Sequence, residues 1–475
     1  MNKLPTLLCL FFSFLISAQE FEDILFDSYE KYKVDGFSQR RTAPQLVYSE
    51  LQRQNNNVFK VRPVSTSIEG KPIYLVSAGR GETSVLLWSQ MHGNESTATR
   101  ALMDVFKFFQ QDDDLNAFRE TLLSSLNLHF VPMLNPDGGK KWQRRNRLGV
   151  DINRDALRLQ SPESQILKKL RDSLQAEFGY NLHDQSRYYN AEFTSKPATI
   201  SFLATAYNEE KSINENRAKS MKLVLSMNEV LQKFAPGHVG RYIDDFEPRA
   251  FGDNIQLWGT SLVLIESGGY FNDREKEFIR KLNFVIILSS LHEIATKKYA
   301  QYDIDDYEKI PRNDRKMFDL KIVNLNYPLL DKMYLVDMGI NQNEIEDSSE
   351  NGFSYFGALV DFGDLSTYYG YETFDAEGYT YLSPKTYSGS LKDISEWDLL
   401  KQGYAFKTYP HINGNYIFKN VILNRIKDGK GYSDASKKVN FFLKKDDTIK
   451  FAVINGFLID IEKQKLPQGF NAKIE

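Results

Sequence analysis

The chain has 475 residues, of which 41% are hydrophobic and 26% are charged, and its formal net charge is −3. This length allows two domains and a sizeable core, and the composition is typical of a folded globular protein, which excludes a largely disordered one. No basic excess indicates a nucleic-acid partner, so none is expected.

The first 18 residues have the pattern of a secretory signal peptide. Lys3 precedes an apolar run at residues 7–16, and small residues follow at 17–18, as before a cleavage site. The run is too short for a membrane span, and no second candidate follows. The only cysteine, Cys9, lies in this run, so we expect no disulfide and no thiolate ligand in the mature chain. A secreted or periplasmic protein is expected.

Up to about residue 298, expected strands alternate with expected helices. The strands are 59–76 (as a hairpin), 85–88, 126–133, 180–183 and 261–265, and the helices are 19–57 (broken at Gly36), 96–109, 163–177, 208–234 and 273–298. This pattern predicts an α/β domain over residues 19–300, with a central sheet flanked by helices.

The composition changes near Tyr299. Residues 301–316 are charged and include Pro311, which is typical of a linker. From residue 317 to 475, short strands rich in Tyr and Phe are broken by Gly, Asn and Asp, which predicts a smaller all-β accessory module.

Ionisable side chains stand where three of the expected strands end. His92 and Glu95 lie in the turn after the first of these strands, His183 ends the second, and Glu266 ends the third. Each of them alone is an ordinary turn or strand-end residue. In open α/β sheets, however, ligands bind beyond the carboxyl ends of the strands, so these ends together predict one site.

Six short motifs, in this order, resemble the zinc carboxypeptidase family of metallopeptidases. They are residues 67–73, 91–95, 135–138 (expected as a turn), 144–154 (which begins in a basic loop), 182–183 and 265–266. The resemblance covers roughly residues 50–298 and implies that the central sheet, flanked by helices, is mixed. It implies one Zn²⁺ per chain, held by His92, Glu95 and His183, with a coordination position left for water.

The resemblance also implies which residues carry out the reaction. Glu266 would be the general base that takes a proton from the attacking water and passes it to the leaving amine. Arg144 would stabilise the developing oxyanion, and Arg145 would replace it if the register of the loop is shifted by one residue.

A third implied role is recognition of the substrate's terminal carboxylate. Asn153 and Arg154 resemble the pair that binds it, and a planar guanidinium suits two-point binding of a carboxylate. The alternative for Arg154 is an ordinary salt bridge with Asp151 or Asp155.

The segment before Glu266 departs from the family pattern. Tyr242 is the nearest candidate for the family's mobile tyrosine, and Asn254 stands where a tryptophan is often found. Because this segment shapes the side-chain pocket, the preferred terminal residue stays open. Arg249 lies there and could favour an acidic terminal residue.

These observations predict a secreted zinc metallocarboxypeptidase that hydrolyses C-terminal peptide bonds with a metal-activated water. Its substrate would be a peptide with a free C-terminal carboxylate. Two alternatives stay open. The same zinc fold could act on cell-wall peptides or N-acyl amino acids, or the chain could be a catalytically silent peptide-binding protein.

Overall fold

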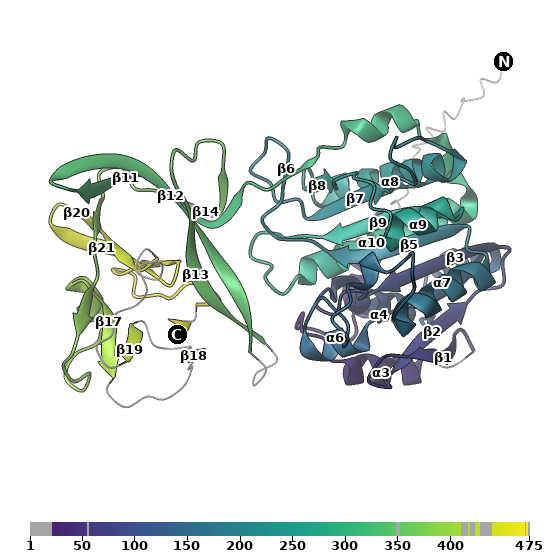
Figure 1. Cartoon of the computed structure of the whole chain (residues 1–475), viewed down its shortest axis with the longest axis horizontal. Helices are drawn as coiled ribbons and strands as arrows, with labels where there is room; N and C mark the ends of the chain where they lie inside the picture. Colours follow the sequence, from purple (N-terminus) through teal and green to yellow (C-terminus); the bar gives the residue numbers. More distant parts are fainter. Residues whose placement is uncertain are drawn as a thin grey trace, which may run out of the picture.

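The computed structural model describes residues 21–54, 57–347, 352–409, 417–418, 423–427, 439–470 and 472–473. The expected signal peptide and Cys9 lie outside these residues. Figure 1 shows two adjacent parts, an α/β part around one sheet and a second part made mainly of strands.

One eight-stranded mixed sheet forms the centre of the α/β part. In spatial order its strands are β1 (Lys60–Thr66), β2 (Pro72–Ala78), β4 (Leu126–Val131), β3 (Thr83–Ser89), β5 (Phe178–Asp184), β9 (Ser261–Ser267), β7 (Ile200–Ala204) and β8 (Val239–Arg241). The pairs β1–β2, β2–β4 and β7–β9 are antiparallel, whereas β4, β3, β5 and β9 run parallel. The expected mixed sheet is therefore confirmed.

Three neighbouring parallel strands bring their carboxyl ends to one edge of this sheet. In the register of β3, β5 and β9, Ser89 stands opposite Leu182, and His183 stands opposite Glu266. Side chains that end or directly follow these strands therefore share one edge, as the strand-end argument predicted.

Helices cover both faces of the sheet. Val85 and Leu87 pack into one core with α4 (Thr97–Phe109), α8 (Glu215–Phe234) and α10 (Glu277–Thr296). Leu86 and Trp88 pack into a second core with α7 (Pro162–Leu174) and α9 (Phe251–Leu257). Because alternate strand residues point to opposite faces, a strand buried on both faces is continuously apolar, as residues 85–88 are.

The remaining elements of the α/β part are short. They are α1 (Phe21–Asp27), α2 (Tyr29–Tyr32), α3 (Pro44–Arg53), α5 (Asn116–Ser125), α6 (Pro136–Lys141), β6 (Asn190–Ala191), and the 3₁₀ helices η1 (Ile152–Arg154) and η2 (Lys298–Gln301).

Two asparagine caps change the expected boundaries. Residues 135–138, expected as a turn, open α6, because Asn135 Oδ1 accepts a hydrogen bond from the backbone N–H of Gly138 at 2.9 Å. The helix expected from residue 208 begins at Glu215, where Asn214 Oδ1 accepts from the N–H of Arg217 at 2.9 Å.

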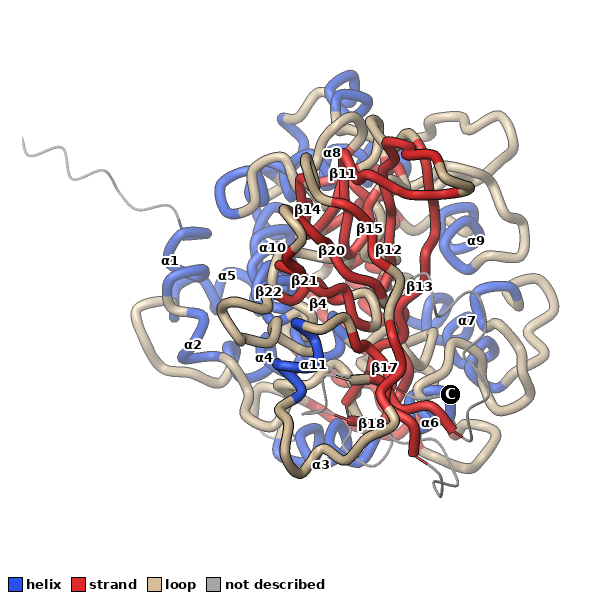
Figure 2. The backbone as a smooth tube through the Cα atoms, turned by 90° about the vertical axis from the view of Figure 1, so that its left-hand side faces the viewer, coloured by secondary structure: helices blue, strands red, loops and turns tan. Residues whose placement is uncertain are grey.

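The second part consists largely of β-strands, as expected (Figure 2). Its main sheet has the order β13 (Gly352–Gly363), β12 (Lys332–Asp347), β11 (Met317–Leu329), β15 (Thr380–Leu382), β20 (Phe441–Lys445), β21 (Thr448–Ile454) and β22 (Phe457–Asp460), with β14 (Tyr369–Asp375) beside β11. Smaller sheets join β16 (Lys385–Tyr387), β17 (Tyr404–Tyr409) and β19 (Asn424–Lys427), and β18 (Ile417–Phe418) with β23 (Ala472–Lys473). A short helix, α11 (Glu396–Lys401), precedes β17.

Residues 301–316, expected as a linker, pack against the α/β part. They contain η3 (Ile304–Lys309) and β10 (Asn313–Asp314), which pairs with β6. Tyr307 is buried, and its Oη accepts a hydrogen bond from the backbone N–H of Ala204 at 2.9 Å. The domain boundaries stay a prediction.

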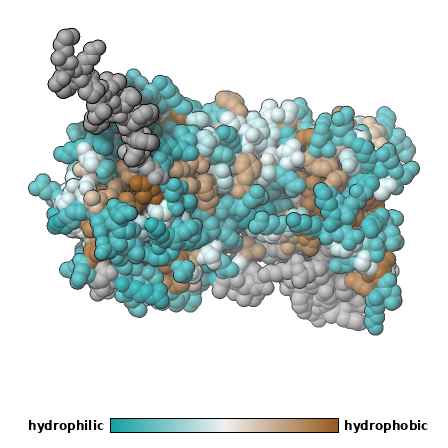
Figure 3. Space-filling view, turned by 180° about the vertical axis from the view of Figure 1, so that it is seen from behind, coloured by the Kyte–Doolittle hydropathy of each residue, from teal (hydrophilic) through white to brown (hydrophobic). Residues whose placement is uncertain are grey.

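Two further observations concern the hydropathy of one face and of the helices. The face in Figure 3 is mostly hydrophilic, with hydrophobic side chains in scattered groups. In the part of the chain that the structure describes, no helix combines the length and the apolar character needed to cross a membrane.

A buried ion pair ties the N-terminal segment to the helices on the sheet. Asp104 on α4 and Arg280 on α10 are both fully buried, and two Asp104–Arg280 hydrogen bonds measure 2.6 and 2.7 Å. Asp104 also accepts from Tyr29 Oη at 2.9 Å and from the backbone N–H of Val34 at 2.8 Å. Asp104 is therefore the point where α4, α10 and the N-terminal segment meet.

We predict that Asp104→Ala lowers the free energy of unfolding by about 3–5 kcal/mol, because it leaves the Arg280 guanidinium buried without its carboxylate. Denaturant unfolding measures this change. In the control variant Arg53→Gln, which removes a side chain that is 74% exposed and pairs with Glu50, the loss should stay below about 1 kcal/mol. Equal losses in the two variants would contradict the prediction.

Candidate metal centre

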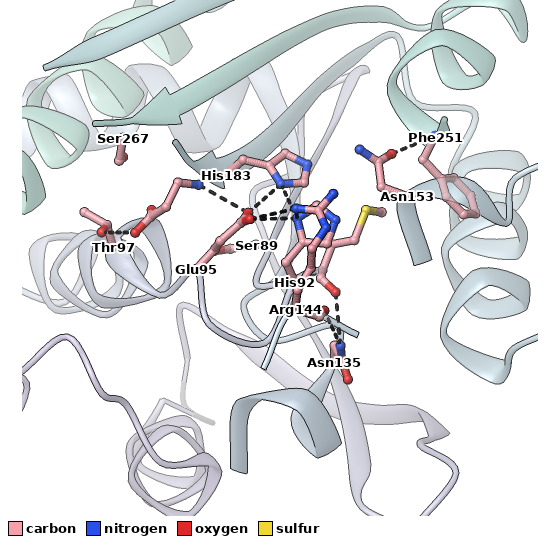
Figure 4. Close-up of polar contacts among 12 residues, drawn as sticks. Ser89, His92, Glu95, Thr97, Asn135, Arg144, Asn153, His183, Phe251 and Ser267 are labelled. Carbon is pink, nitrogen blue, oxygen red and sulfur yellow. Dashed lines mark hydrogen bonds and ion pairs between the residues drawn. The ribbon is translucent and has the colours of Figure 1, made fainter. Parts of the chain in front are cut away.

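Three side chains converge at the carboxyl edge of the sheet (Figure 4). The ligand atoms of His92, Glu95 and His183 all lie within 4.8 Å of one another. The two carboxylate oxygens of Glu95 lie 2.9 Å from His92 Nδ1 and 2.8 Å from His183 Nδ1. The three residues that the resemblance implied as ligands are thus brought together from β5 and from the turn after β3.

The chemistry of this donor set fits a divalent metal. The two Nδ1 atoms lie 3.1 Å apart and both face the same carboxylate, so their lone pairs can point at one shared centre. His92, Glu95 and His183 are only 2%, 8% and 3% exposed. Two imidazoles and one carboxylate, all buried, form a ligand set that zinc prefers.

The electrostatics of the two histidines differ. Burial lowers the pKa of His183, which keeps its ring neutral, as a metal ligand must be. Burial also opposes protonation of His92, but the neighbouring Glu95 and Asp151 carboxylates outweigh it and raise the pKa of His92. Because a metal competes with protons for these rings, metal affinity should fall as the pH falls.

Close packing explains the glycine after His92. A Cβ on Gly93 would lie 2.0 Å from the carbonyl carbon of Gly138, so only glycine lets α6 approach this turn. Asn135, the cap of α6, also donates through Nδ2 to the backbone oxygen of Met91 at 3.2 Å. The 135–138 motif therefore supports the turn that carries His92 and Glu95.

The 67–73 motif has a similar supporting role. Ser67 Oγ donates to Asp137 Oδ1 at 2.9 Å, and Lys71 Nζ donates to the same oxygen at 2.5 Å. Asp137 is fully buried in α6. The hairpin between β1 and β2 is thereby fixed to the helix beneath the site.

Asp151 is a site residue that the sequence analysis named only as an alternative partner of Arg154. Its Oδ1 lies 3.2 Å from His92 Nε2, and its Oδ2 accepts from Arg144 Nε at 3.0 Å. Burial would raise the pKa of Asp151, but His92 and Arg144 hold it below its usual range. A carboxylate at Nε2 orients the imidazole so that Nδ1 faces the metal position.

The structure distinguishes between the two candidate arginines of the basic loop. Arg144 Nη1 lies 3.2 Å from Glu95 Oε1 and 3.1 Å from His92 Nδ1, so this guanidinium faces the site. Arg145 instead donates through Nη1 to the backbone oxygen of Gly149 at 2.9 Å. The geometry favours Arg144 as the cation of the site.

Glu266 lies on the strand next to that of His183. Its side chain is 8% exposed, and as the register partner of His183 it points to the same side of the sheet. Burial, reinforced by the charges of Glu95 and Asp184, raises the pKa of Glu266 well above its usual value. A buried carboxyl of raised pKa beside a metal position is suited to general base chemistry.

The expected carboxylate-binding pair lies next to α9. Asn153 Oδ1 accepts from the backbone N–H of Phe251 at 2.9 Å (Figure 4). Arg154 Nε lies 3.3 Å from Glu247 Oε2, and its side chain is 38% exposed. The partner of Arg154 is thus Glu247, rather than Asp151 or Asp155.

Glu247 also pairs with Arg249. Two hydrogen bonds of 2.9 Å join the Arg249 guanidinium to both oxygens of Glu247. The charge of Arg249 is therefore already balanced by a neighbour, which weakens its proposed preference for an acidic terminal residue.

The last two predicted features of this segment are Tyr242 and Asn254. Burial, then the nearby Glu266, raises the pKa of Tyr242, whose ring centroid lies 6.2 Å from that of Tyr189. Asn254 Nδ2 donates to the backbone oxygens of Pro248 and Ala250, both at 2.7 Å. Asn254, which stands where a tryptophan is often found, therefore stabilises the loop between Tyr242 and α9.

Comparison with known proteins gives a family match for one segment of the chain. Residues 47–161 match the family model described as zinc carboxypeptidase, which confirms the resemblance over this segment. The match includes His92 and Glu95 and ends before His183 and Glu266, which the fold brings to the same edge.

Several individual proteins are similar. Carboxypeptidase SOL1 of Arabidopsis thaliana is 23% identical over 190 residues, which cover 34% of this chain and 38% of that protein. The chain thus spans less than two fifths of that relative's length. A metallo-carboxypeptidase structure from Burkholderia cenocepacia has a TM-score of 0.45 and 15% identity, covering 54% of this chain and 70% of its own. The carboxypeptidase A structure of Helicoverpa armigera has a TM-score of 0.43 and 17% identity, and the match covers 60% of this chain and 81% of that chain.

We predict that Asp151→Asn lowers zinc affinity by roughly 10–100-fold, because a neutral amide orients the His92 ring less firmly than a carboxylate does. Competition with a chromophoric chelator measures this change. The control Asp155→Asn alters the same loop at a carboxylate that accepts from Gln160 and Ser161. If both variants lose zinc affinity equally, the effect belongs to the loop and not to the Asp151–His92 contact.

Proposed function

We propose that this protein is a zinc-dependent metallocarboxypeptidase that removes C-terminal residues from peptides. The main support is the convergence of the His92, Glu95 and His183 ligand atoms beside Glu266, the buried carboxyl on the neighbouring strand. We also propose that the chain is secreted or periplasmic, on the basis of its first 18 residues.

In this proposal, His92, Glu95 and His183 would hold Zn²⁺, which when bound would polarise the scissile carbonyl and lower the pKa of water. Glu266 accepts a proton from the attacking water at its carboxylate and delivers it to the nitrogen of the leaving amine. Arg144 donates N–H groups to the oxygen of the scissile carbonyl as negative charge develops there.

The substrate's terminal carboxylate would bind at Asn153 and Arg154. Glu247 already contacts Arg154 Nε at 3.3 Å, so an incoming carboxylate must share this guanidinium with Glu247 or displace it. A guanidinium has five N–H donors, so it can contact two carboxylates at once. The neighbouring Asn153 would add its side-chain amide N–H groups, because its Oδ1 is engaged by Phe251.

We predict that Glu266→Gln keeps its zinc but lowers kcat by about 10²–10⁴-fold, because glutamine cannot accept the proton of the attacking water. Metal analysis and hydrolysis of peptides ending in Phe, Lys or Glu test this together. The control Glu120→Gln makes the same exchange at a side chain that is 60% exposed. Unchanged hydrolysis in Glu266→Gln would remove Glu266 from the mechanism.

The pH profile provides a separate prediction. Only the ionised carboxylate of Glu266 can accept a proton, so activity should be lost as the pH falls through its raised pKa. We expect the acidic limb of kcat/KM to lie above pH 4.5, the usual pKa of a glutamate. Zinc content measured in the same buffers controls for metal loss. A limb at or below pH 4.5 with zinc still bound would contradict the proposed role.

A further inference from the structure

A cavity of about 210 Å³ lies where β12 meets the carboxyl ends of β5 and β9. Its lining includes Gln185 and Gly268 from the α/β part and Gln342 and Glu344 from β12. It adjoins a larger groove of about 760 Å³ between the two parts of the molecule, and Arg274 lines both.

This cavity begins directly beside the metal centre. Gln185 follows His183 by two residues, and Gly268 follows Glu266 by two residues. At about 3.3 Å per residue of extended chain, its nearest wall starts about 7 Å beyond the site residues. Lys276, also in the lining, donates through Nζ to the backbone oxygen of Ser267 at 2.8 Å.

The cavity lies on the opposite side of the metal centre from the proposed carboxylate-binding pair. Figure 4 places Asn153 and Phe251 on one side of the two histidines, and Ser267 and Thr97 on the other. A peptide whose terminal carboxylate binds near Asn153 and that crosses the two histidines would extend its upstream residues toward Ser267, and the next residue, Gly268, lines the cavity.

The mainly β part is firmly attached here. Arg40 binds Glu344 through two hydrogen bonds of 2.6 and 3.0 Å, and Tyr188 Oη donates to Asp319 Oδ2 at 2.7 Å. Tyr371 Oη also donates to the backbone oxygen of Arg187 at 2.6 Å. These contacts fix β11, β12 and β14 against the α/β part, and β12 contributes Gln342 and Glu344 to the wall of the cavity.

The cations that line the cavity are balanced, with one exception. Arg40 pairs with Glu344, Arg187 pairs with Asp319 at 3.0 Å, and Lys276 pairs with Asp184 at 3.1 Å. These three pairs leave Arg274 as the remaining lining cation. Within the described ranges, no carboxylate forms an ion pair with its guanidinium.

Arg274 is held in place by neutral neighbours. Its guanidinium carbon lies 4.2 Å from the ring centroid of Tyr355 and 5.7 Å from that of Phe457. Nη2 donates to Gln342 Oε1, whereas Nη1 is buried and has no hydrogen-bond partner among the residues that the structure describes. Because the charge of Arg274 has no carboxylate partner among the described residues, a ligand carboxylate that contacts the guanidinium gains affinity.

We propose that this cavity is a substrate subsite in which Arg274 binds the carboxylate of an acidic side chain upstream of the scissile bond. The proposal rests on the proposed function, which fixes the direction of the peptide. At about 3.3–3.6 Å per residue, a wall that begins two residues beyond His183 and Glu266 corresponds to the second residue upstream of the scissile bond. A lysine there would be repelled by the positive charge of Arg274, and an apolar side chain would leave that charge without a counter-charge.

The test uses the zinc-loaded full chain and the peptides acetyl-X-Ala-Phe, where X is Glu, Gln or Lys. The set is repeated with terminal Lys or Glu, so that the result does not depend on the preferred terminal residue. We expect kcat/KM to be roughly tenfold or more higher for X = Glu than for X = Gln, and lowest for X = Lys.

Two variants assign this preference to Arg274. In Arg274→Gln the Glu-to-Gln ratio of kcat/KM should fall to about one, and in Arg274→Glu the order should reverse in favour of Lys. The control Arg53→Gln makes the same exchange far from the site and should keep the wild-type ratio. A wild type without preference for Glu, or a preference that survives in Arg274→Gln, overturns the proposal.

Binding separates failure of this subsite from failure of the proposed function. Calorimetry with the Glu266→Gln protein should show roughly tenfold tighter binding of the X = Glu peptide than of the X = Gln peptide, and Arg274→Gln should abolish this difference. If no peptide is hydrolysed but this difference is present, the proposed function fails, whereas binding of an acidic side chain by Arg274 stands. If the difference is absent, the subsite is refuted whether or not hydrolysis occurs.

Discussion

The carboxylate of Glu95 between two buried imidazoles is the interaction on which the rest of the site depends. Glu95 contacts His92 at 2.9 Å and His183 at 2.8 Å, although His183 is 88 positions further along the chain. The parallel register of β3, β5 and β9 makes this meeting possible, because it aligns three strand ends at one edge. The same alignment places Glu266 beside His183.

Several recognised motifs act by supporting these ligands. Asn135 caps α6 and holds the turn at Met91, Gly93 allows α6 to pack against that turn, and Asp151 orients the His92 ring. The resemblance to the zinc carboxypeptidase family therefore records packing requirements as well as chemistry. Asp137, tied to Ser67 and Lys71, shows the same for the hairpin motif.

The sequence predicted those features that have a local signal. The apolar run at 85–88 and the polar residues at strand ends were sufficient to predict an α/β sheet with one site at its strand ends. The resemblance added that the sheet is mixed and that His92, Glu95 and His183 are the ligands. The resemblance named Arg144 with Arg145 as the alternative, and the loop conformation was needed to favour Arg144 between them. The Arg154–Glu247 pair joins residues 93 positions apart, so it leaves no local pattern in the sequence. The short α9 and the wall formed by β12 also have no periodic signal, since long-range packing determines both.

The segment that leads to Arg40 links the two parts of the molecule mechanically. Arg280 donates to the backbone oxygens of Val34 and Phe37, and a few residues later Arg40 binds Glu344 on β12. This short stretch thus connects the two parts, because one end is bound to a buried arginine and the other end forms an ion pair with the mainly β part. A substitution that removes the contacts of Arg280 would therefore loosen the position of Arg40 and, through Glu344, that of β12, although Arg280 lies among helices remote from the cavity.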